Sequence, residues 1–370
     1  MEYRILPHGG HKIGVVGMGS AVIGRQPHEE MLRTIRRAYE LGVNMFDMAG
    51  GHGAVFGAYG EALKDVRDKV YLQVHFGAVY TDGGEYGWTT DLEKIKESFE
   101  WQLKLLQTDY VDFGFIHCLD EDKDLQTYIN NGVLDYIMEQ KARGVVRQIG
   151  FSSHTPSVVN RVLDMGIVDI LMFSINPLYD LGQGEYDRGD YGKGESAERH
   201  EMYCRCQREG VGITVMKPFS GGQLLNAQRS PFGHGLTHAQ CIRYALDKPG
   251  VVSVLPGFGC LKEAEEVLSY FETTPEQRDY SILSTLAPKQ NMGRCVYCRH
   301  CHPCPAGLDV ALINKYYDLA RIGDNLAREH YLTLDKKAGD CIACGHCDGR
   351  CPFHVNQSGR MTEIKEYFGE

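Results

Sequence analysis

The sequence has no apolar run near the ~18 residues that a membrane-spanning helix requires, and no charged-then-apolar leader follows Met1. We therefore expect neither a membrane span nor secretion. Positive charge is also scarce, because 39 Lys and Arg are set against 49 Asp and Glu, for a formal net charge of −10. An acidic chain without a basic patch argues against nucleic acid as a partner.

The sequence also lacks a G-x-G-x-x-G turn after its first strand, since Gly17-Met18-Gly19 is too short. That absence argues against an open, doubly wound nucleotide-binding sheet. Short apolar runs instead alternate with amphipathic segments from Lys12 to about Tyr270. The predicted strands are Ile13–Val16, Asn44–Met48, Val70–His75, Val111–His117, Val146–Ser152, Ile170–Asn176, Gly212–Lys217 and Val252–Leu255, with helices such as Glu29–Leu41, Leu92–Leu106, Gly132–Lys141 and Thr237–Leu246 between them.

Eight strand-then-helix units are what a closed (β/α)8 TIM barrel requires, and its strands are apolar throughout because both of their faces are buried. We place this α/β barrel at residues 1–272. In such a barrel the chemistry lies at the carboxyl ends of the strands, which brings one carboxylate, several imidazoles and one ammonium to a single mouth. The candidate site residues found there are Asp47, His52, His75, His117, Ser152, Ser153, Asn176 and Lys217.

Eight of the 13 cysteines fall in two runs, Cys295–Pro305 (CVYCRHCHPCP) and Cys341–Pro352 (CIACGHCDGRCP). Each run has three thiols two residues apart and a fourth directly before a proline. In two-cluster ferredoxins the fourth cysteine ligates the other cluster. We therefore predict two [4Fe-4S] clusters in a ferredoxin-like domain over residues 273–370, which begins with a linker helix at Thr274–Pro288. One cluster takes Cys295, Cys298, Cys301 and Cys351, and the other takes Cys341, Cys344, Cys347 and Cys304.

A pair of tetrahedral zinc sites is the alternative for the same thiols. The first run also departs from the bacterial ferredoxin spacing, with two residues rather than three between its third and fourth cysteines. The other five cysteines are scattered along the chain. Unpaired cysteines and oxygen-sensitive clusters lead us to expect the reducing environment of the cytoplasm.

The chain resembles an aldo-keto reductase with a C-terminal ferredoxin domain. MEYRILPHGGHKIGVVGMG is similar to the opening hairpin and first strand of that family, and GVNMFDMA, DYVDFGFIH, IGFSSH, VMKPFSGGQLL and IRYALDKPGVVSVLPG are similar to later barrel segments. CRHCHPCPAGLDV and CIACGHCDGRCP are similar to the cluster segment. The resemblance implies reduction of a carbonyl group by nicotinamide hydride, with a catalytic set of Asp, Tyr, Lys and His.

Two members of that set are replaced here. Asp47 matches the aspartate and His117 the histidine, whereas His52 stands in the place of the tyrosine and His75 in that of the lysine. Tyr59 is nearby but aligns with the following helix. A histidine has an unperturbed pKa of about 6.5 and can serve as a proton donor, so we predict catalytic roles for Asp47, His52, His75 and His117.

The resemblance also implies a nicotinamide site. Ser152 and Ser153 resemble the pair that holds the nicotinamide amide, and Asn176 and Lys217 are further candidate contacts. After Pro256-Gly257, where the family holds the adenosine, this chain departs from the usual polar residues. Two glycine- and tyrosine-rich loops, Gly77–Thr90 and Asp180–Glu195, are predicted lids over a polar substrate; their acidic residues Asp82, Glu85, Glu185, Asp187 and Asp190 suit a hydroxylated or cationic one.

Three hypotheses follow. The favoured one is a cytoplasmic iron–sulfur oxidoreductase acting on a small carbonyl or hydroxylated substrate, with NAD(P)H and an electron-transfer partner. Each cluster moves one electron and hydride carries two, so coupling them requires a flavin, a radical intermediate or an external splitter. The alternative is a lyase or isomerase, in which Asp47 and the histidines do acid–base chemistry or hold a divalent metal. A non-catalytic electron carrier on a decayed barrel is the third.

Overall fold

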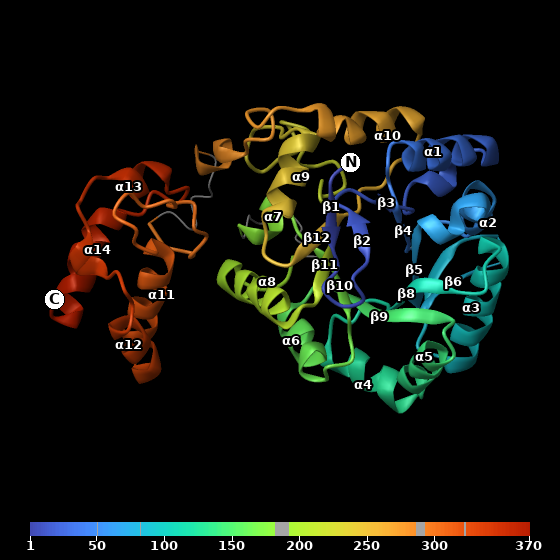
Figure 1. Cartoon of the computed structure of the whole chain (residues 1–370), viewed down its shortest axis with the longest axis horizontal. Helices are drawn as coiled ribbons and strands as arrows, with labels where there is room; N and C mark the ends of the chain where they lie inside the picture. The colour runs from blue at the N-terminus through green and yellow to red at the C-terminus, as the bar shows by residue number, and fades with distance from the viewer. Residues whose placement is uncertain (50, 82, 182–191, 286–292, 322) are drawn as a thin grey trace.

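The computed structural model describes residues 1–49, 51–81, 83–181, 192–285, 293–321 and 323–370. Its centre is a single sheet of parallel strands in the order β12-β11-β10-β9-β8-β5-β4-β3. Parallel bridges from Val16 to Val254 and from Gly19 to Gly257 join its two edges, so the sheet closes as a barrel (Figure 1). The strands are β3 (Met18–Gly19), β4 (Met45–Met48), β5 (Tyr71–Phe76), β8 (Val111–Ile116), β9 (Val146–Ser153), β10 (Ile170–Ser174), β11 (Gly212–Met216) and β12 (Val251–Val254).

The predicted barrel is confirmed, with one strand placed differently. The apolar run Ile13–Val16 was predicted as the first barrel strand. In the structure Lys12–Gly14 (β2) pairs antiparallel with Tyr3–Ile5 (β1), and the barrel strand β3 begins at Met18. The hairpin and the strand are continuous in apolar character, so periodicity alone could not separate them.

Helices form the outer ring of the barrel (Figure 1). Local signals explain several of their ends, for example the reciprocal capping box of Thr237 and Gln240 at α9 and the Asp91 cap of α3, both of which satisfy N–H groups that a helix start leaves free. The ring comprises α1 (His28–Glu40), α2 (Ala54–Leu63), α3 (Leu92–Leu106), α4 (Asp122–Asn130), α5 (Val133–Ala142), α6 (Pro156–Asp164), α7 (Pro177–Asp180), α8 (Ser196–Glu209), α9 (His238–Leu246) and α10 (Leu261–Leu268), with 3-10 turns η1 (Ile23–Arg25), η2 (Lys64–Lys69), η4 (Ser269–Glu272) and η5 (Ser281–Thr285).

The described residues of the first predicted lid form a hairpin. Strands β6 (Ala78–Tyr80) and β7 (Tyr86–Trp88) pair antiparallel directly after β5, with Tyr80 opposite Tyr86. Of the second predicted lid, residues 182–191 lie outside the described part of the chain, as do Asp82, Glu185, Asp187 and Asp190 among the acidic residues assigned to the two loops.

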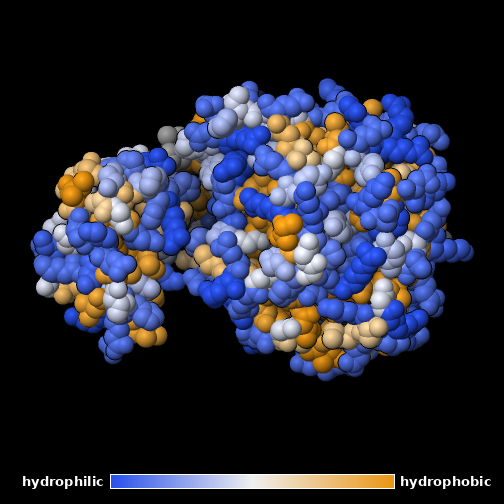
Figure 2. Space-filling view, viewed as in Figure 1, coloured by the Kyte–Doolittle hydropathy of each residue, from blue (hydrophilic) through white to orange (hydrophobic). Residues whose placement is uncertain are grey.

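The C-terminal segment forms a lobe beside the barrel on the face shown in Figure 2. It contains α11 (Val310–Arg321), α12 (Asn325–Leu332), η7 (Ala338–Asp340), α13 (His346–Arg350) and α14 (Gln357–Phe368), which surround their own apolar cluster. The predicted linker helix Thr274–Pro288 is wrong over its described part, where the only helical element is the short 3-10 turn η5; residues 286–292 lie outside the description. Among the described residues, no helix is long and apolar enough to cross a bilayer.

Candidate active site at the barrel mouth

Three of the predicted catalytic residues meet at the ends of neighbouring strands. Asp47 on β4 lies opposite Gln73 on β5, and His75 lies two residues further along β5, so it points to the same side as Gln73. The parallel pairing of β5 with β8 brings His117, one residue past β8, alongside Phe76, whose carbonyl accepts from the His117 N–H at 3.0 Å. All three side chains are buried, with exposed fractions of 5, 1 and 6% for Asp47, His75 and His117.

Direct hydrogen bonds join these side chains into a chain. His75 Nε2 lies 2.8 Å from Asp47 Oδ1, and His75 Nδ1 lies 3.0 Å from His117 Nδ1. Gln73 Nε2 donates to the same Asp47 oxygen at 2.7 Å. The expectation that site residues lie at the carboxyl ends of the strands therefore placed Asp47, His75 and His117 together correctly. It missed Gln73, which lies on the same face of β5 as His75.

If both imidazoles are neutral, the contacts assign which ring nitrogens carry protons. A carboxylate only accepts hydrogen bonds, so His75 Nε2 carries hydrogen toward Asp47. In a neutral imidazole the other nitrogen is then an acceptor, so His75 Nδ1 accepts from His117 Nδ1–H. By the same rule His117 Nε2 is an acceptor, and the chain runs in one direction toward Asp47.

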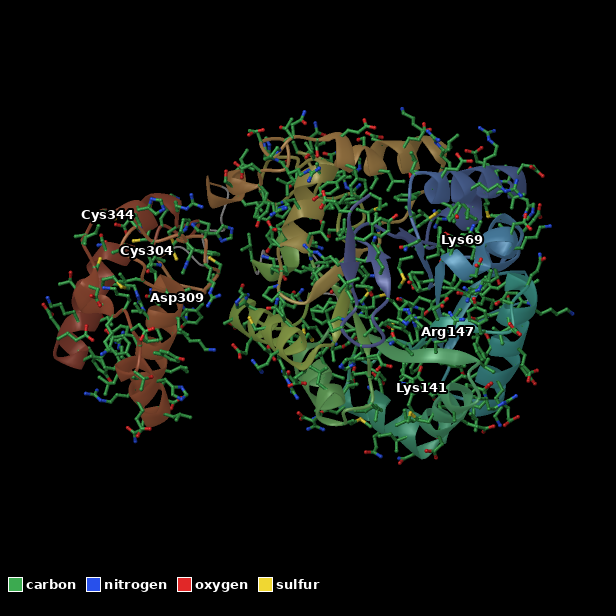
Figure 3. The ribbon with its side chains drawn as sticks, in the orientation of Figure 1. Lys69, Lys141, Arg147, Cys304, Asp309 and Cys344 are labelled. Atoms are coloured by element: carbon green, nitrogen blue, oxygen red, sulfur yellow. The ribbon has the colours of Figure 1, made fainter. Side chains whose placement is uncertain are left out.

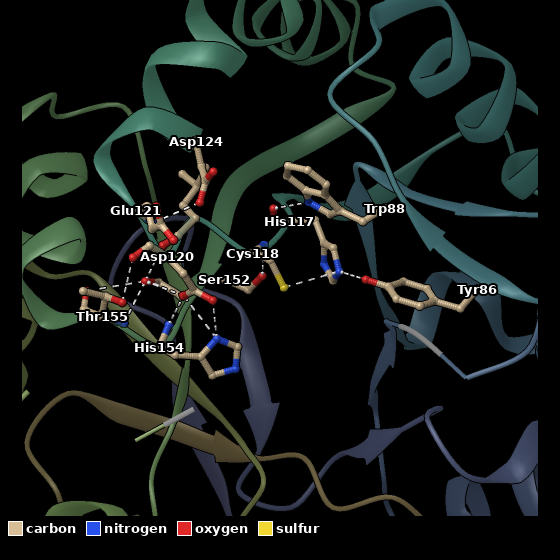
Figure 4. Close-up of polar contacts among 12 residues, drawn as sticks. Tyr86, Trp88, His117, Cys118, Asp120, Glu121, Asp124, Ser152, His154 and Thr155 are labelled. Carbon is tan, nitrogen blue, oxygen red and sulfur yellow. Dashed lines mark hydrogen bonds and ion pairs between the residues drawn. The ribbon is translucent and has the colours of Figure 1, made fainter. Parts of the chain in front are cut away.

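The donor to His117 is a residue that sequence reasoning had not selected. Tyr86 O–H lies 2.6 Å from His117 Nε2, and the side chains of Tyr86 and Trp88 both point to His117 in Figure 4. Trp88 Nε1 donates to the His117 carbonyl at 3.4 Å. Both residues belong to β7, in the loop predicted only as an aromatic lid. The glycine pair Gly83-Gly84 directly before aromatic residues was the available signal for a hairpin.

His52 lies apart from this chain. Its Nδ1 accepts from the Ala54 N–H at 3.1 Å, and it bridges to Glu85 of the hairpin. A Cβ on Gly84 would lie 2.1 Å from His52 Cε1, so the imidazole packs directly on the Gly84 backbone. The Gly53 N–H also donates to the Gly84 carbonyl at 2.7 Å. The described contacts thus place His52 where it supports the hairpin that carries Tyr86, and its predicted catalytic role stays a prediction.

The electrostatic environment keeps His117 neutral. Burial lowers the pKa of His117 well below its ordinary value, and the neighbouring His75, His154 and Lys217 lower it further. Burial likewise lowers the pKa of Lys217. Tyr59 is no substitute donor, because it is buried in α2 and burial raises the pKa of its hydroxyl far above the ordinary value.

A second polar network lies across the mouth from Tyr86 (Figure 4). His154 Nδ1 lies 2.9 Å from Asp120 Oδ2, and the His154 N–H donates to Asp120 Oδ1 at 2.6 Å. Burial lowers the pKa of His154 in spite of that carboxylate. The Asp120 carboxylate therefore fixes the backbone and ring of His154 together, next to the strand end that holds Ser152 and Ser153.

The predicted nicotinamide contacts sit on three successive strand ends. Ser152 Oγ accepts from the Cys118 N–H at 2.9 Å, and Ser153 Oγ donates to the Leu119 carbonyl. The side-chain amide of Asn176 donates to the Lys217 carbonyl at 2.9 Å and accepts from the Tyr179 N–H at 3.0 Å. The Ser153 hydroxyl and the Asn176 amide are thus engaged within the protein, and Asn176 is held to the backbone of Lys217. The predicted nicotinamide contacts of these residues stay predictions.

The start of α10 carries negative charge. The Gly259 N–H donates to Glu263 Oε2 at 2.6 Å, and the Leu261 N–H donates to Glu30 Oε1 at 3.4 Å. Helix N-termini are ready-made anion sites, and here two of the protein's own carboxylates already occupy the donors. This end of the mouth therefore disfavours an additional phosphate.

The histidines do not fit the predicted alternative of a divalent metal. Both nitrogens of His75 are used, one by Asp47 and the other by His117. Within the described ranges no group of three or more His, Cys, Asp or Glu side chains converges as ligands of a single ion.

The cysteines instead surround two separate cavities. One is lined by Cys304, Cys341, Cys344 and Cys347 together with apolar side chains that include Leu308 and Met361. The other is lined by Cys295, Cys298, Cys301 and Cys351 beside Phe353. Figure 3 labels Cys304 and Cys344, from the two different runs, in the same part of the C-terminal lobe. An iron–sulfur cube has a different iron under each thiolate, so its ligands ring a cavity rather than converge on one point, and the donor set fits such a group.

The second of these cavities adjoins the barrel. Cys298 and His300 line a further cavity together with Asp180, Tyr203 and Lys248. Asp180 ends α7, four residues after Asn176, and its buried carboxylate pairs with Arg199 at 2.9 Å. The cysteines of the second cavity, which include Cys298, thus lie beside the segment that leaves the mouth after β10. In the first cavity, by contrast, Cys344 is exposed.

Comparisons with known proteins agree with this fold. The L-galactose dehydrogenase of Arabidopsis thaliana is 25% identical over 300 residues, covering 72% of this chain and 86% of that protein. The holo form of aldo-keto reductase AKR11C1 from Bacillus halodurans superposes with a TM-score of 0.62 at 22% identity, over 78% of this chain and 97% of that one. An aldo/keto reductase from Klebsiella pneumoniae in complex with NADP and acetate gives 0.54 at 18% identity, over 75% and 93%.

The family comparison settles the identity of the barrel. The model of the Aldo/keto reductase family matches residues 13–240, which include the candidate active site and end before the two cysteine runs. The chain therefore belongs to the aldo/keto reductase family and is an oxidoreductase of that family.

Proposed function

We propose that this enzyme interconverts a small polar carbonyl compound and its alcohol at the barrel mouth, and that its C-terminal lobe holds two [4Fe-4S] clusters that exchange electrons with a partner protein. The observation that supports the first part is the directed chain from His117 through His75 to Asp47. A buried, ordered path of this kind moves a proton to or from a substrate oxygen, which carbonyl chemistry requires.

Nicotinamide supplies or accepts the hydride in this proposal. The solved relative from Klebsiella pneumoniae contains NADP, and the strand ends of this chain offer Ser152, Ser153, Asn176 and Lys217 as its holders. Lys217 and the buried amide of Asn176 fix the edge of the site. The neighbouring residues exclude water from the proton path, since Asp47 and His75 are almost fully buried.

The cluster proposal is supported by the two cavities, each lined by four cysteines drawn from both runs in the predicted partition. Two clusters take one electron each, which matches the two electrons of one carbonyl–alcohol interconversion. Because hydride moves both electrons at once, the coupling requires a flavin, a radical intermediate or an external splitter. The cluster held by Cys304, Cys341, Cys344 and Cys347 is the entry side for a partner's electrons, because Cys344 is exposed. The cluster held by Cys295, Cys298, Cys301 and Cys351 is the barrel side, because Cys298 shares a cavity with Asp180.

The experiment is metal analysis of anaerobically purified protein. We expect about eight irons and eight sulfides per chain, as two [4Fe-4S] clusters contain. Cys344→Ser should lower the iron content and alter one cluster spectrum, whereas Cys260→Ser, outside both runs, should change neither. A content of four or fewer metal ions without sulfide would overturn the cluster proposal. The carbonyl chemistry of the barrel would still be tested separately, by turnover.

A further inference from the structure

The hydrogen-bonded chain at the mouth has one accessible end. Asp47, His75 and His117 are each no more than 6% exposed, whereas Tyr86 is 41% exposed. Its hydroxyl donates to His117 Nε2 at 2.6 Å. Tyr86 is therefore the member of this hydrogen-bonded chain whose side chain a substrate entering the mouth can reach.

The hairpin holds that hydroxyl in place from several sides. Trp88, two residues away on β7, donates to the His117 carbonyl, and Tyr128 O–H donates to the same carbonyl at 3.2 Å. On the other side His52 packs on Gly84, and Gly53 donates to the Gly84 carbonyl. The resemblance implies that the segment around His52 carries the family's proton donor. In this chain that segment instead supports the β6–β7 hairpin, which presents Tyr86.

We propose that Tyr86 is the catalytic acid and base of this enzyme, supplied by the hairpin after β5, and that His52 is a positioning residue for that hairpin. This inference rests on the proposed carbonyl–alcohol chemistry. Tyr86 takes over the chemical role of the missing tyrosine from a different part of the chain, and the His117–His75–Asp47 relay takes over from the missing lysine.

In the oxidative direction the step balances as follows. The hydride leaves the carbinol carbon for oxidised nicotinamide while the alcohol O–H proton passes to the Tyr86 oxygen. The Tyr86 proton moves to His117 Nε2, the His117 Nδ1 proton to His75 Nδ1, and the His75 Nε2 proton to Asp47. Each histidine ends neutral with its tautomer exchanged, and Asp47 holds the one added proton; reduction is the reverse.

The surroundings suit a relay that never holds an imidazolium. His117 faces His75, His154 and Lys217, and burial together with these groups keeps its pKa low. A proton that stopped on His117 would be buried near the Lys217 ammonium, whereas a concerted shift toward Asp47 ends on the one carboxylate of this hydrogen-bonded chain.

The test compares Tyr86→Phe with a matched variant, Tyr80→Phe, which removes the hydroxyl opposite in the same hairpin. The assay is reduction of 4-nitrobenzaldehyde by NADH. General acid catalysis is worth roughly 10²–10⁴-fold, so Tyr86→Phe should lose at least about a hundredfold in kcat with KM little changed, and Tyr80→Phe should keep wild-type kcat. His52→Gln should cost less than Tyr86→Phe. Full activity in Tyr86→Phe, or a larger loss in His52→Gln, would overturn the assignment.

A second readout needs no turnover. In protein labelled with ¹⁵N-histidine, NMR should report His117 protonated on Nδ1 and His75 on Nε2, and Tyr86→Phe should shift the His117 Nε2 resonance while Tyr80→Phe leaves it in place. If the wild type reduces no carbonyl probe, the proposed function fails while these spectra still test the Tyr86–His117 pair. An Nε2-protonated His117, or spectra unchanged by Tyr86→Phe, would contradict the relay.

Discussion

Replacement of Asp47 by asparagine is the perturbation that the site geometry constrains most closely. Asp47 Oδ1 accepts from both Gln73 Nε2 and His75 Nε2, at 2.7 and 2.8 Å. An asparagine keeps the shape and one acceptor oxygen, but it removes the charge and cannot receive the relayed proton. If its amide turned toward His75, the histidine would have to exchange its tautomer, and the relay would run backwards.

The magnitude follows from the lost proton acceptor. The two hydrogen bonds exist before the reaction and an oxygen acceptor remains for them, so their weakening acts mainly on folding. Transfer of a proton in the transition state is worth roughly 10²–10⁴-fold, and we take about 3–4 kcal/mol of it as lost. At 1.36 kcal/mol per decade, kcat should fall about 10²–10³-fold. Because the substitution is isosteric, the melting temperature should drop by only a few degrees, the usual effect of about 1 kcal/mol.

The assay is steady-state reduction of 4-nitrobenzaldehyde by NADH, with thermal unfolding measured on the same preparations. Asp68→Asn is the matched control, since Asp68 is exposed on η2 and its substitution should change neither quantity. An Asp47→Asn enzyme within threefold of wild-type kcat would refute the relay, and an unfolded variant would show that Asp47 is needed for the fold itself.

Two further predictions concern the hairpin and the coenzyme. Gly84→Ala places a Cβ at 2.1 Å from His52, at a residue with φ of +85°, whereas the Cβ of Gly83→Ala meets nothing nearer than 3.7 Å. The kcat of Gly84→Ala should fall at least about tenfold, because Tyr86 is displaced from its near-attack position. The kcat of Gly83→Ala should stay unchanged. Equal activities would show that Gly84 does not position the hairpin. The carboxylates of Glu263 and Glu30 at the start of α10 should make NADH preferred over NADPH by about tenfold, which corresponds to about 1.4 kcal/mol of repulsion. Glu263→Gln should narrow that preference, and a wild type that favours NADPH would contradict it.

The fold was predictable from local patterns because barrel strands are buried on both faces and each is followed by an amphipathic helix. Even helix starts could be read from Thr237 with Gln240 at α9. The first barrel strand could not be predicted in this way. The run around Ile13 is as apolar as a barrel strand, but it pairs with Tyr3–Ile5 in a hairpin. Thr274 with Pro275 likewise resembled a helix start, yet the described residues after it make only turns.

The site was predictable to the extent that the strand-end rule determines it. Asp47, His75 and His117 lie at such ends and meet as expected. Tyr86 could not be found in this way, because its contact with His117 depends on how a hairpin folds back over the mouth, and that is a tertiary property. His52 was predicted to stand in the place of the resembled family's tyrosine, but its imidazole packs against Gly84 rather than joining the hydrogen-bonded chain.

In the proposed function, electrons pass between the barrel mouth and two proposed clusters of the same chain. The most direct measurement is an anaerobic titration of the purified protein with NADH, with the reduced clusters followed by electron paramagnetic resonance. We expect signals of reduced clusters that grow with added NADH and decline when a carbonyl substrate is supplied. Clusters that stay oxidised while NADH is consumed in carbonyl reduction would contradict this electron path and would leave the C-terminal lobe with a structural role.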